Sequence, residues 1–329
     1  MADVYSQEKM LAVFSQKFEI DGKKCVGHIK TAISNVFVFP DKVYKIYKND
    51  NSFFNDNFND ISQKNKRFDF TIKDFDWNQR MAPEIYLTIR GCVMRDGQIV
   101  FVEKEEAEEL VIEMKKIDTN SALLLQLLDK NLSLTDFETI GFQLHKRLDD
   151  LPEAYTQKKL KGVMQLRMED VSNWVLGVPK HISPEEAKIF LEALDRKKSA
   201  YMNQVSDEEM AGSNIDGHSE NMFFNQGRLY IMDSYAPKKD WLLADGHLNF
   251  YRLATDILAL GNQESFEAFK GGYEKYRDLG VMNEKRESFC IFYSSMIMVP
   301  YLYMLGEHDE RRMKAARIYH NFVRNLLGQ

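Results

Sequence analysis

A short hairpin in the second half of the sequence carries the side chains with the most definite chemistry. Two apolar runs, 222–224 and 228–232, flank a turn that ends at Gly227, a pattern typical of paired strands. Residues equidistant from a turn become neighbours on paired strands, so Asn221 and Asp233, each six positions from Gly227, should meet at the open end of the hairpin. Amide and carboxylate oxygens are ligands that Mg²⁺ takes beside substrate phosphates.

A third oxygen group precedes the hairpin. Asp216 lies five residues before Asn221 in the polar loop 214–220. The order Asp-x-x-x-x-Asn, hairpin, Asp is the arrangement of kinase catalytic machinery, in which the first Asp accepts the proton of the acceptor hydroxyl and the other two residues hold Mg²⁺. We therefore expect Asp216 to be the catalytic base, with Asn221 and Asp233 as metal ligands.

Phosphoryl transfer also needs a cation on the phosphates of the nucleotide. Lys45, on a predicted strand in the first third of the chain, is the candidate, whereas Lys48 lies at an odd spacing and should face the other side of that strand. Asp74, on the helix that follows, is the expected acidic partner of Lys45. Asp69 and Asp76 are nearby alternatives.

The elements that position these residues change character along the chain. The first third is strand-rich, with predicted strands at 36–39, 43–47, 85–93 and 98–102 and one helix at 60–81. Residues 111–117 are interpreted as a connector. Beyond them helices are predicted, with a capping box at Thr135 and Glu138, an N-cap at Ser183 before Pro184 and Glu186, and helices at 250–260, 284–305 and 310–327.

Composition narrows the class of protein. The chain has 329 residues, 44% of them hydrophobic, and a net charge of −6, which favours two globular domains or one bilobed domain and no basic surface for nucleic acid. Its three cysteines are far apart and no apolar leader is visible, so a reducing, cytoplasmic setting is expected. The uncharged run 289–305 is interpreted as a buried helix, kinked or ended near Pro300, and not as a membrane span.

Several segments together resemble the aminoglycoside phosphotransferase-like kinases, within the wider protein-kinase-like fold, and most of all a bacterial branch of largely undefined substrates. Asn78-Gln79-Arg80-Met81-Ala82-Pro83-Glu84-Ile85-Tyr86-Leu87 resembles an Asn-Arg-Arg-Leu-Ala-Pro-x-x-Tyr-Leu stretch of that branch. The other matching segments, in the same order as in the family, are 28–37, 43–46, 113–117, the Asp216 loop and 254–257.

The resemblance implies an α+β, bilobed fold. A small antiparallel-sheet lobe with one helix would span 1–112, a hinge 113–118, and a mainly helical large lobe 119–329. ATP would place its adenine against the hinge, near Glu113 and Lys115, and its phosphates against residues 31–35, where Ser34 and Asn35 replace the glycine-rich loop of other kinases. Asp256 would support the catalytic loop.

The same resemblance implies an ATP- and Mg²⁺-dependent transfer of phosphate to a hydroxyl group of a small molecule. Two alternatives remain open. One is a protein kinase or self-phosphorylating regulator. The other is a nucleotide-binding pseudokinase or interaction module, because Asn214 stands where the family has histidine and Asp74 where glutamate is usual. Glu220, Asp240 and Asp245 would allow a cationic acceptor.

Overall fold

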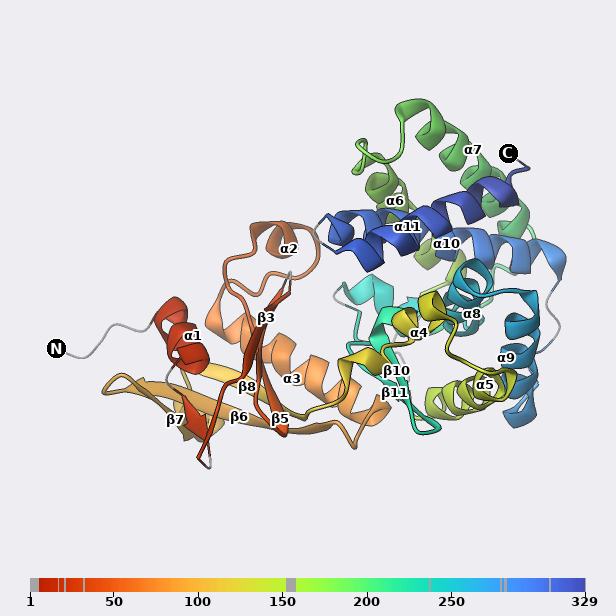
Figure 1. Cartoon of the computed structure of the whole chain (residues 1–329). Coiled ribbons are helices and arrows are strands. Elements are labelled where there is room, and N and C mark those ends of the chain that lie inside the picture. The colour runs from red at the N-terminus through yellow and green to blue at the C-terminus, as the bar shows by residue number, and fades with distance from the viewer. Residues whose placement is uncertain are drawn as a thin grey trace. The chain divides into compact units, whose positions relative to one another are not determined.

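The computed structural model describes residues 6–16, 18–20, 22–31, 33–151, 158–236, 238–278, 280, 283–307 and 309–328. The chain forms two compact units, Met1–Asp118 and Thr119–Gln329 (Figure 1). The first is built around a sheet and the second is mainly helical, so the predicted α+β fold class is confirmed.

A six-stranded antiparallel sheet forms the first unit, in the order β3-β4-β5-β8-β6-β7. Its strands are β3 (Gly27–Lys30), β4 (Ser34–Val38), β5 (Lys42–Tyr47), β6 (Tyr86–Arg95), β7 (Gln98–Val102) and β8 (Glu109–Lys115). A small separate ladder joins β1 (Glu19–Ile20) to β2 (Lys23–Lys24). The four predicted strands correspond to β4, β5, β6 and β7, and the predicted helix to α3 (Lys64–Met81).

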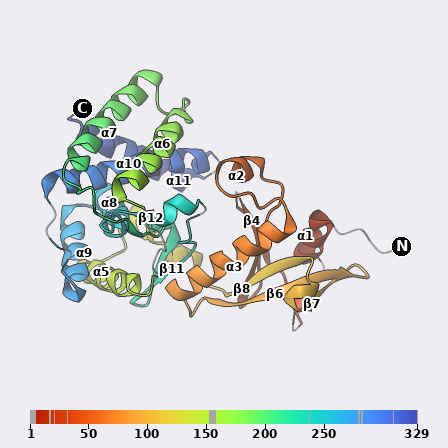
Figure 2. The ribbon, with the colours of Figure 1, turned by 180° about the vertical axis from the view of Figure 1, so that it is seen from behind.

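Helix α3 lies along one face of this sheet (Figure 2). Successive residues of a strand point to opposite faces, and on β5 it is Lys45 and Tyr47 that face α3. The ring of Tyr47 meets Phe70 of α3 edge to face, with centroids 4.9 Å apart. Lys45 therefore lies on the face of the sheet that packs against α3, as the alternation of side chains along the strand predicts.

The opposite face of the sheet is covered by α1 (Gln7–Gln16), a helix that the sequence analysis did not predict. Phe14 of α1 stacks on Phe37 at 5.1 Å and belongs to a buried cluster with Tyr44 and Ile46. A second unpredicted helix, α2 (Ser52–Asn57), begins at Asn51, whose side chain accepts from the N–H of Phe54. The expectation of a sheet with one helix is therefore wrong.

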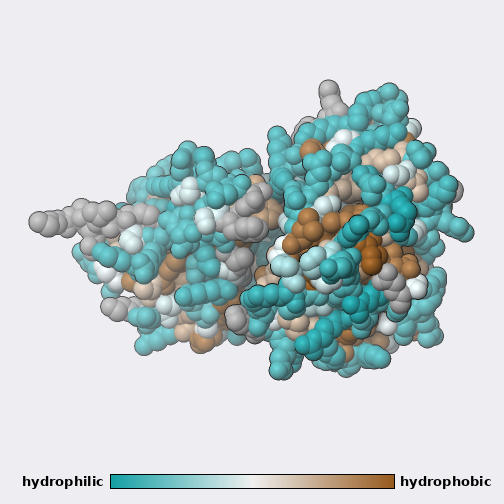
Figure 3. Space-filling view, turned by 90° about the horizontal axis from the view of Figure 1, so that it is seen from above, coloured by the Kyte–Doolittle hydropathy of each residue, from teal (hydrophilic) through white to brown (hydrophobic). Residues whose placement is uncertain are grey.

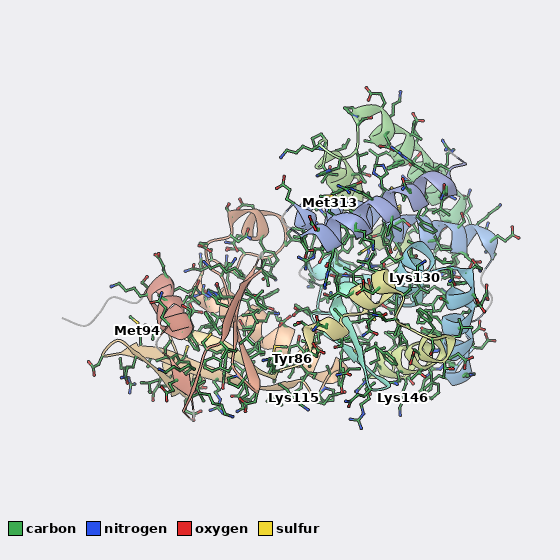
Figure 4. All side chains as sticks on the ribbon, in the orientation of Figure 1. Tyr86, Met94, Lys115, Lys130, Lys146 and Met313 are labelled. Atoms are coloured by element: carbon green, nitrogen blue, oxygen red, sulfur yellow. The ribbon has the colours of Figure 1, made fainter. Side chains whose placement is uncertain are left out.

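The predicted hinge begins inside the sheet. Residues 113–115 form the end of β8, which pairs with β5 on one side and β6 on the other, and the division between the units follows Asp118. The exposed side chain of Lys115 marks this end of the strand (Figure 4). Residues 111–115 therefore belong to a central strand and not to a connector. The charged residues Glu113, Lys115 and Lys116 interrupt the apolar pattern by which such a strand is recognised in a sequence.

The second unit is a helical assembly around α10. Its helices are α4 (Leu123–Asp129), α5 (Leu134–Leu148), α6 (Leu160–Leu176), α7 (Pro184–Met202), α8 (Leu248–Leu260), α9 (Gln263–Tyr276), α10 (Glu284–Gly306) and α11 (Glu310–Leu326). Helix α10 is long and apolar enough to cross a membrane, but 78% of its most apolar window is buried, against α6, α7, α8 and α11. The prediction of a buried helix at 289–305 is confirmed, although α10 continues past Pro300.

Hydrophobic residues also reach the surface of this unit. In the space-filling view they gather on one part of a face that is otherwise hydrophilic (Figure 3). Leu166 and Leu176 of α6 are among the exposed ones, at 44% and 57%.

Capping residues set the starts of two of these helices. Ser183 accepts from the N–H of Glu186 at the start of α7, as predicted. At the start of α5 the capping box is formed by Ser133 and Asp136 instead of Thr135 and Glu138, because the helix begins two residues earlier than expected.

The hairpin that carries the candidate residues is held against α4 and α5. Its strands, β10 (Met222–Asn225) and β11 (Arg228–Ile231), form a separate two-stranded sheet. Gln143 of α5 accepts from the N–H of Leu229 at 2.9 Å and donates to the carbonyl of Gly227 at 2.7 Å. These bonds fix the turn end of the hairpin and leave its open end to carry the candidate site.

Candidate functional site

In the first unit Lys45 and Asp74 form a buried ion pair. The Lys45 Nζ atom lies 3.7 Å from Asp74 Oδ2, and the two side chains are 6% and 5% exposed. Asn78, one turn further along α3, donates to Asp74 Oδ1 at 3.0 Å. Of the three acids that the sequence left open, Asp74 is therefore the one beside Lys45, whereas Asp69 pairs with Lys73 at the surface.

The predicted phosphate-binding segment is organised by its own side chains. Ser34 is buried and its hydroxyl lies 2.8 Å from that of Thr31, which also accepts from the N–H of Ser34. Asn35 is buried, with Oδ1 2.9 Å from His28 Nε2. Ala32 lies outside the described residues. These contacts hold the backbone of the segment, and the side chains of Ser34 and Asn35 have partners within the first unit.

The side chain of Glu113 is engaged elsewhere. Its carboxylate contacts both Lys42 and Arg90. Burial alone would raise the pKa of Glu113, but these two cations more than offset it, so the pKa lies below its ordinary value. The N–H of Lys115 donates to the carbonyl of Ile85 at 2.8 Å. The structure thus places Glu113 and Lys115 in the sheet framework.

In the second unit the loop that carries Asp216 is held by α8 through its backbone. Asn249 accepts from the N–H of Ile215 at 3.0 Å, and Asp256 accepts from the N–H of Ser219 at 2.6 Å. Asp256 also accepts from the hydroxyl of Tyr319. The expectation that Asp256 supports this loop is consistent with these bonds.

Asn214 also anchors the loop. Its Nδ2 donates to the carbonyl of Trp241 at 3.1 Å, and its backbone N–H donates to Leu242.

Two basic side chains approach the carboxylate of Asp216. Arg252 Nη2 lies 3.3 Å from Oδ1, and His218 Nε2 lies 3.7 Å from Oδ2. Burial would raise the pKa of Asp216, but His218 and Arg252 outweigh it and hold that pKa well below its ordinary value. Burial would likewise lower the pKa of His218, but Asp216 raises it above its usual value. Asp216 is therefore held as a carboxylate.

Sequence reasoning missed Arg252, although one signal was available. Arg252 and Asp256 are four residues apart on α8, and residues at this spacing share a helix face. The residue that supports the loop and the residue that pairs with its carboxylate thus come from the same face of one helix.

The hairpin has a register one residue away from the predicted one. Met222 pairs with Ile231, and the two-residue turn is Gln226-Gly227, both with positive φ (51° and 72°), as in a type I′ turn. Asn221 therefore lies opposite Met232, whose N–H donates to the Asn221 carbonyl at 2.7 Å. Asn225 belongs to the strand and not to the turn.

Asn221 nevertheless gathers the predicted trio. Its Nδ2 donates to the backbone carbonyl of Asp216 at 2.9 Å and to that of Asp233 at 3.1 Å. Asp233 is exposed and has φ of 48°, in the left-handed region that non-glycine residues seldom occupy. The structure thus brings Asp216, Asn221 and Asp233 together through main-chain contacts.

The pair Asn221 and Asp233 fits a magnesium ion by its chemistry. Because both bonds from the Asn221 amide use its nitrogen, its Oδ1 is the atom suited to bind a cation, alongside the Asp233 carboxylate. Within the described ranges no group of three His, Cys, Asp or Glu residues could hold a metal. Mg²⁺ bound with a nucleotide needs only one or two protein ligands, because phosphates and waters supply the rest.

The acids considered for a cationic acceptor each have a cationic partner already. Glu220 pairs with Arg312, and Asp240 pairs with Lys158. Asp245 is buried and bonds to Arg286 and His247. The expectation that these residues recognise a cationic substrate gains no support from their contacts.

The chain was compared with known proteins. No protein-family model matches it, and no curated protein matches it in sequence. Several solved structures, however, do match the chain. A choline/ethanolamine kinase family protein from Mesorhizobium loti superposes with a TM-score of 0.54 and 11% identity, over 98% of this chain and 95% of that one.

Two further solved structures also superpose on the chain. A glucosamine kinase bound to glucosamine, ADP and inorganic phosphate gives a TM-score of 0.52 at 10% identity, covering 94% of this chain and 81% of the other. The aminoglycoside phosphotransferase APH(2″)-IIia, bound to GDP and kanamycin, gives 0.50 at 11% identity, covering 98% of each chain. The chain therefore has the fold shared by aminoglycoside phosphotransferases and choline/ethanolamine kinases.

Proposed function

We propose that the chain is an ATP-dependent phosphotransferase that moves the γ-phosphate to a hydroxyl group of a small molecule. One observation carries the proposal: the amide of Asn221 ties the backbones of Asp216 and Asp233 together, so that a base and two oxygen ligands share one end of the hairpin. The fold supports it, since neighbours of this fold are kinases of small molecules.

In the proposed reaction the acceptor oxygen attacks the γ-phosphorus while the bond from that phosphorus to the β–γ bridging oxygen breaks. ADP leaves, and the proton of the acceptor hydroxyl passes to the carboxylate of Asp216. Asn221 and Asp233 would hold magnesium, which neutralises charge on the phosphates when bound.

The first unit would supply the cation and the nucleotide contacts. Lys45 would bind the α- and β-phosphates, and Asp74 would orient it. We assign phosphate contacts to the main chain of 33–35, because the side chains of Ser34 and Asn35 are engaged with Thr31 and His28. For the same reason we assign adenine contacts near 113–118 to the main chain and not to the carboxylate of Glu113.

The acceptor is proposed to be a small hydroxyl compound, and neither nucleic acid nor a membrane is needed as a partner. We place the reaction in the cytoplasm, where the thiols Cys25, Cys92 and Cys290, which form no disulfide in this structure, would remain reduced.

The test is transfer from labelled ATP with Mg²⁺, and with EDTA, to a panel of hydroxyl metabolites. A reaction without acceptor controls for self-labelling. Asp216→Asn should lower transfer by about 10²–10⁴-fold, the usual contribution of a general base, while ADP binding measured by calorimetry persists. Asp207→Asn, which removes an exposed carboxylate paired with Lys161, is the matched control and should keep full activity.

The outcomes separate the alternatives. Full turnover by Asp216→Asn would reject Asp216 as the base. Label on the protein alone would favour a self-phosphorylating regulator, and nucleotide binding without transfer would favour a pseudokinase.

A further inference from the structure

Arg252 of α8 is a buried cation that the proposed reaction leaves without a role. Its side chain is 3% exposed, and its Nη2 lies 3.3 Å from Oδ1 of Asp216. Its Nη1 reaches the backbone carbonyl of Ser294 on α10, at 3.5 Å. Burying a guanidinium is costly unless a carboxylate pairs with it, so Arg252 and Asp216 depend on each other.

The two oxygens of Asp216 lie in different surroundings. Oδ1 faces Arg252, whereas Oδ2 lies 3.7 Å from His218 Nε2, a distance beyond an ordinary hydrogen bond. The Asp216 side chain is 38% exposed, so a ligand is able to reach it. The pairing with Arg252 therefore distinguishes the oxygen that is held from the oxygen that is open to an acceptor.

The contacts that fix the loop act on its backbone. Ser234 accepts from the N–H of Asp216 at 2.9 Å, and Asn249 accepts from the neighbouring N–H of Ile215. Neither restrains rotation of the Asp216 carboxyl group, which is a soft torsion. Arg252, whose other terminal nitrogen lies 3.5 Å from the Ser294 carbonyl of α10, approaches the carboxylate itself.

We propose that Arg252 is a positioning residue for the transfer: it holds Asp216 by Oδ1, so that Oδ2 receives the proton of the acceptor hydroxyl. This inference rests on the proposed function. A carboxylate that rotates away from the acceptor loses the alignment on which proton transfer depends, and a misplacement of about 1 Å can cost about 10²-fold in rate.

The experiment measures kcat and KM with MgATP, first with water as the acceptor and then with any acceptor found in the panel. Arg252→Met should lower kcat by about 10²-fold and leave KM for ATP within about twofold. Arg252→Lys keeps a cation at this position and should recover part of the lost kcat. Arg324→Met removes an arginine from a surface pair with Glu186 and serves as the control, with unchanged kcat.

A second comparison remains informative if Arg252→Met does not fold. The double variant Asp216→Asn/Arg252→Met leaves no unpaired carboxylate, and because Arg252 acts through Asp216 its kcat should equal that of Asp216→Asn. A further tenfold fall in the double variant would overturn the inference, as would a folded Arg252→Met with wild-type kcat.

The two proposals fail in different ways. If the wild type turns over MgATP and Asp216→Asn does not, a wild-type rate in Arg252→Met rejects the positioning role alone. A wild-type chain without turnover rejects the proposed function, and this inference with it.

Discussion

Helix α3 forms two buried ion pairs with the same sheet, and the two pairs differ in the distance between their charged atoms. Arg67 binds Glu109 through two nitrogens and also donates to the carbonyls of Ile61 and Ser62, at 3.0 and 3.1 Å. Two turns further along, Lys45 and Asp74 stand 3.7 Å apart. All four side chains are nearly inaccessible to solvent.

The difference separates a pair made through hydrogen bonds from a pair made at ion-pair distance. The guanidinium of Arg67 is matched by acceptors from the chain itself, so it holds the helix to β8. Lys45 Nζ and Asp74 Oδ2 lie 3.7 Å apart, beyond hydrogen-bond distance, and Lys45 is the residue proposed to bind the phosphates of the nucleotide. We therefore expect the first pair to determine stability and the second to determine activity.

The largest effect is expected from breaking the close pair. Arg67→Met leaves the carboxylate of Glu109 buried without its main partner, and the free energy of unfolding should fall by about 3–5 kcal/mol. Urea denaturation followed by circular dichroism measures it. The double variant Arg67→Met/Glu109→Gln should regain part of the loss, because no unpaired charge remains. A loss below about 1 kcal/mol for the single variant would contradict the structural role.

A smaller loss of stability and a larger loss of activity are expected from Lys45→Met. The unfolding free energy should fall by about 1–3 kcal/mol, less than for Arg67→Met, because Asn78 still donates to Asp74. Transfer should fall by about 10²–10³-fold, as when one donor to a transition-state oxyanion is removed. The control is Lys73→Met, which removes an exposed lysine of α3 paired with Asp69. Equal transfer rates in the two variants would reject the phosphate role of Lys45.

Much of the sheet could be predicted from the sequence, and the parts that could not have definable causes. Alternating β-branched and aromatic residues indicated β4 and β5, and Pro83 with the apolar spacing before it indicated α3. Helix α1 has only ten residues, and a serine before it, Ser6, is by itself a weak signal for the start of a helix. Its role depends on Phe14 meeting Phe37, a tertiary contact that no local pattern encodes.

The clustering of Asp216, Asn221 and Asp233 was predictable from the sequence, but the side-chain contacts around them were not. Counting from Gly227 brought Asn221 and Asp233 together, yet it placed them one position out of register, because the turn has two residues and not three. The partner of Lys45 stayed ambiguous among three acids until the rotation of α3 on the sheet was known. Arg252 reaches Asp216 only through packing of α8 beneath the loop, which depends on the whole unit.

The smallest effect is expected at Glu113. Its carboxylate is buried and forms ion pairs with Lys42 and Arg90, whose side chains are partly exposed. Burial would raise the pKa of Glu113, but Lys42 and Arg90 lower it in the folded protein. The stabilisation of the fold by these ion pairs is therefore fully present above the ordinary glutamate pKa of about 4.3 and is lost as the pH falls below it. The stability difference between wild type and Glu113→Gln should be about 1 kcal/mol at pH 7 and should shrink toward pH 4, as measured by urea denaturation. Nucleotide affinity should not change at pH 7, because the carboxylate is occupied by two cations of the sheet. A loss of affinity in Glu113→Gln would instead show that this side chain contacts the nucleotide, and would place Glu113 with Lys45 among the functional groups of the first unit.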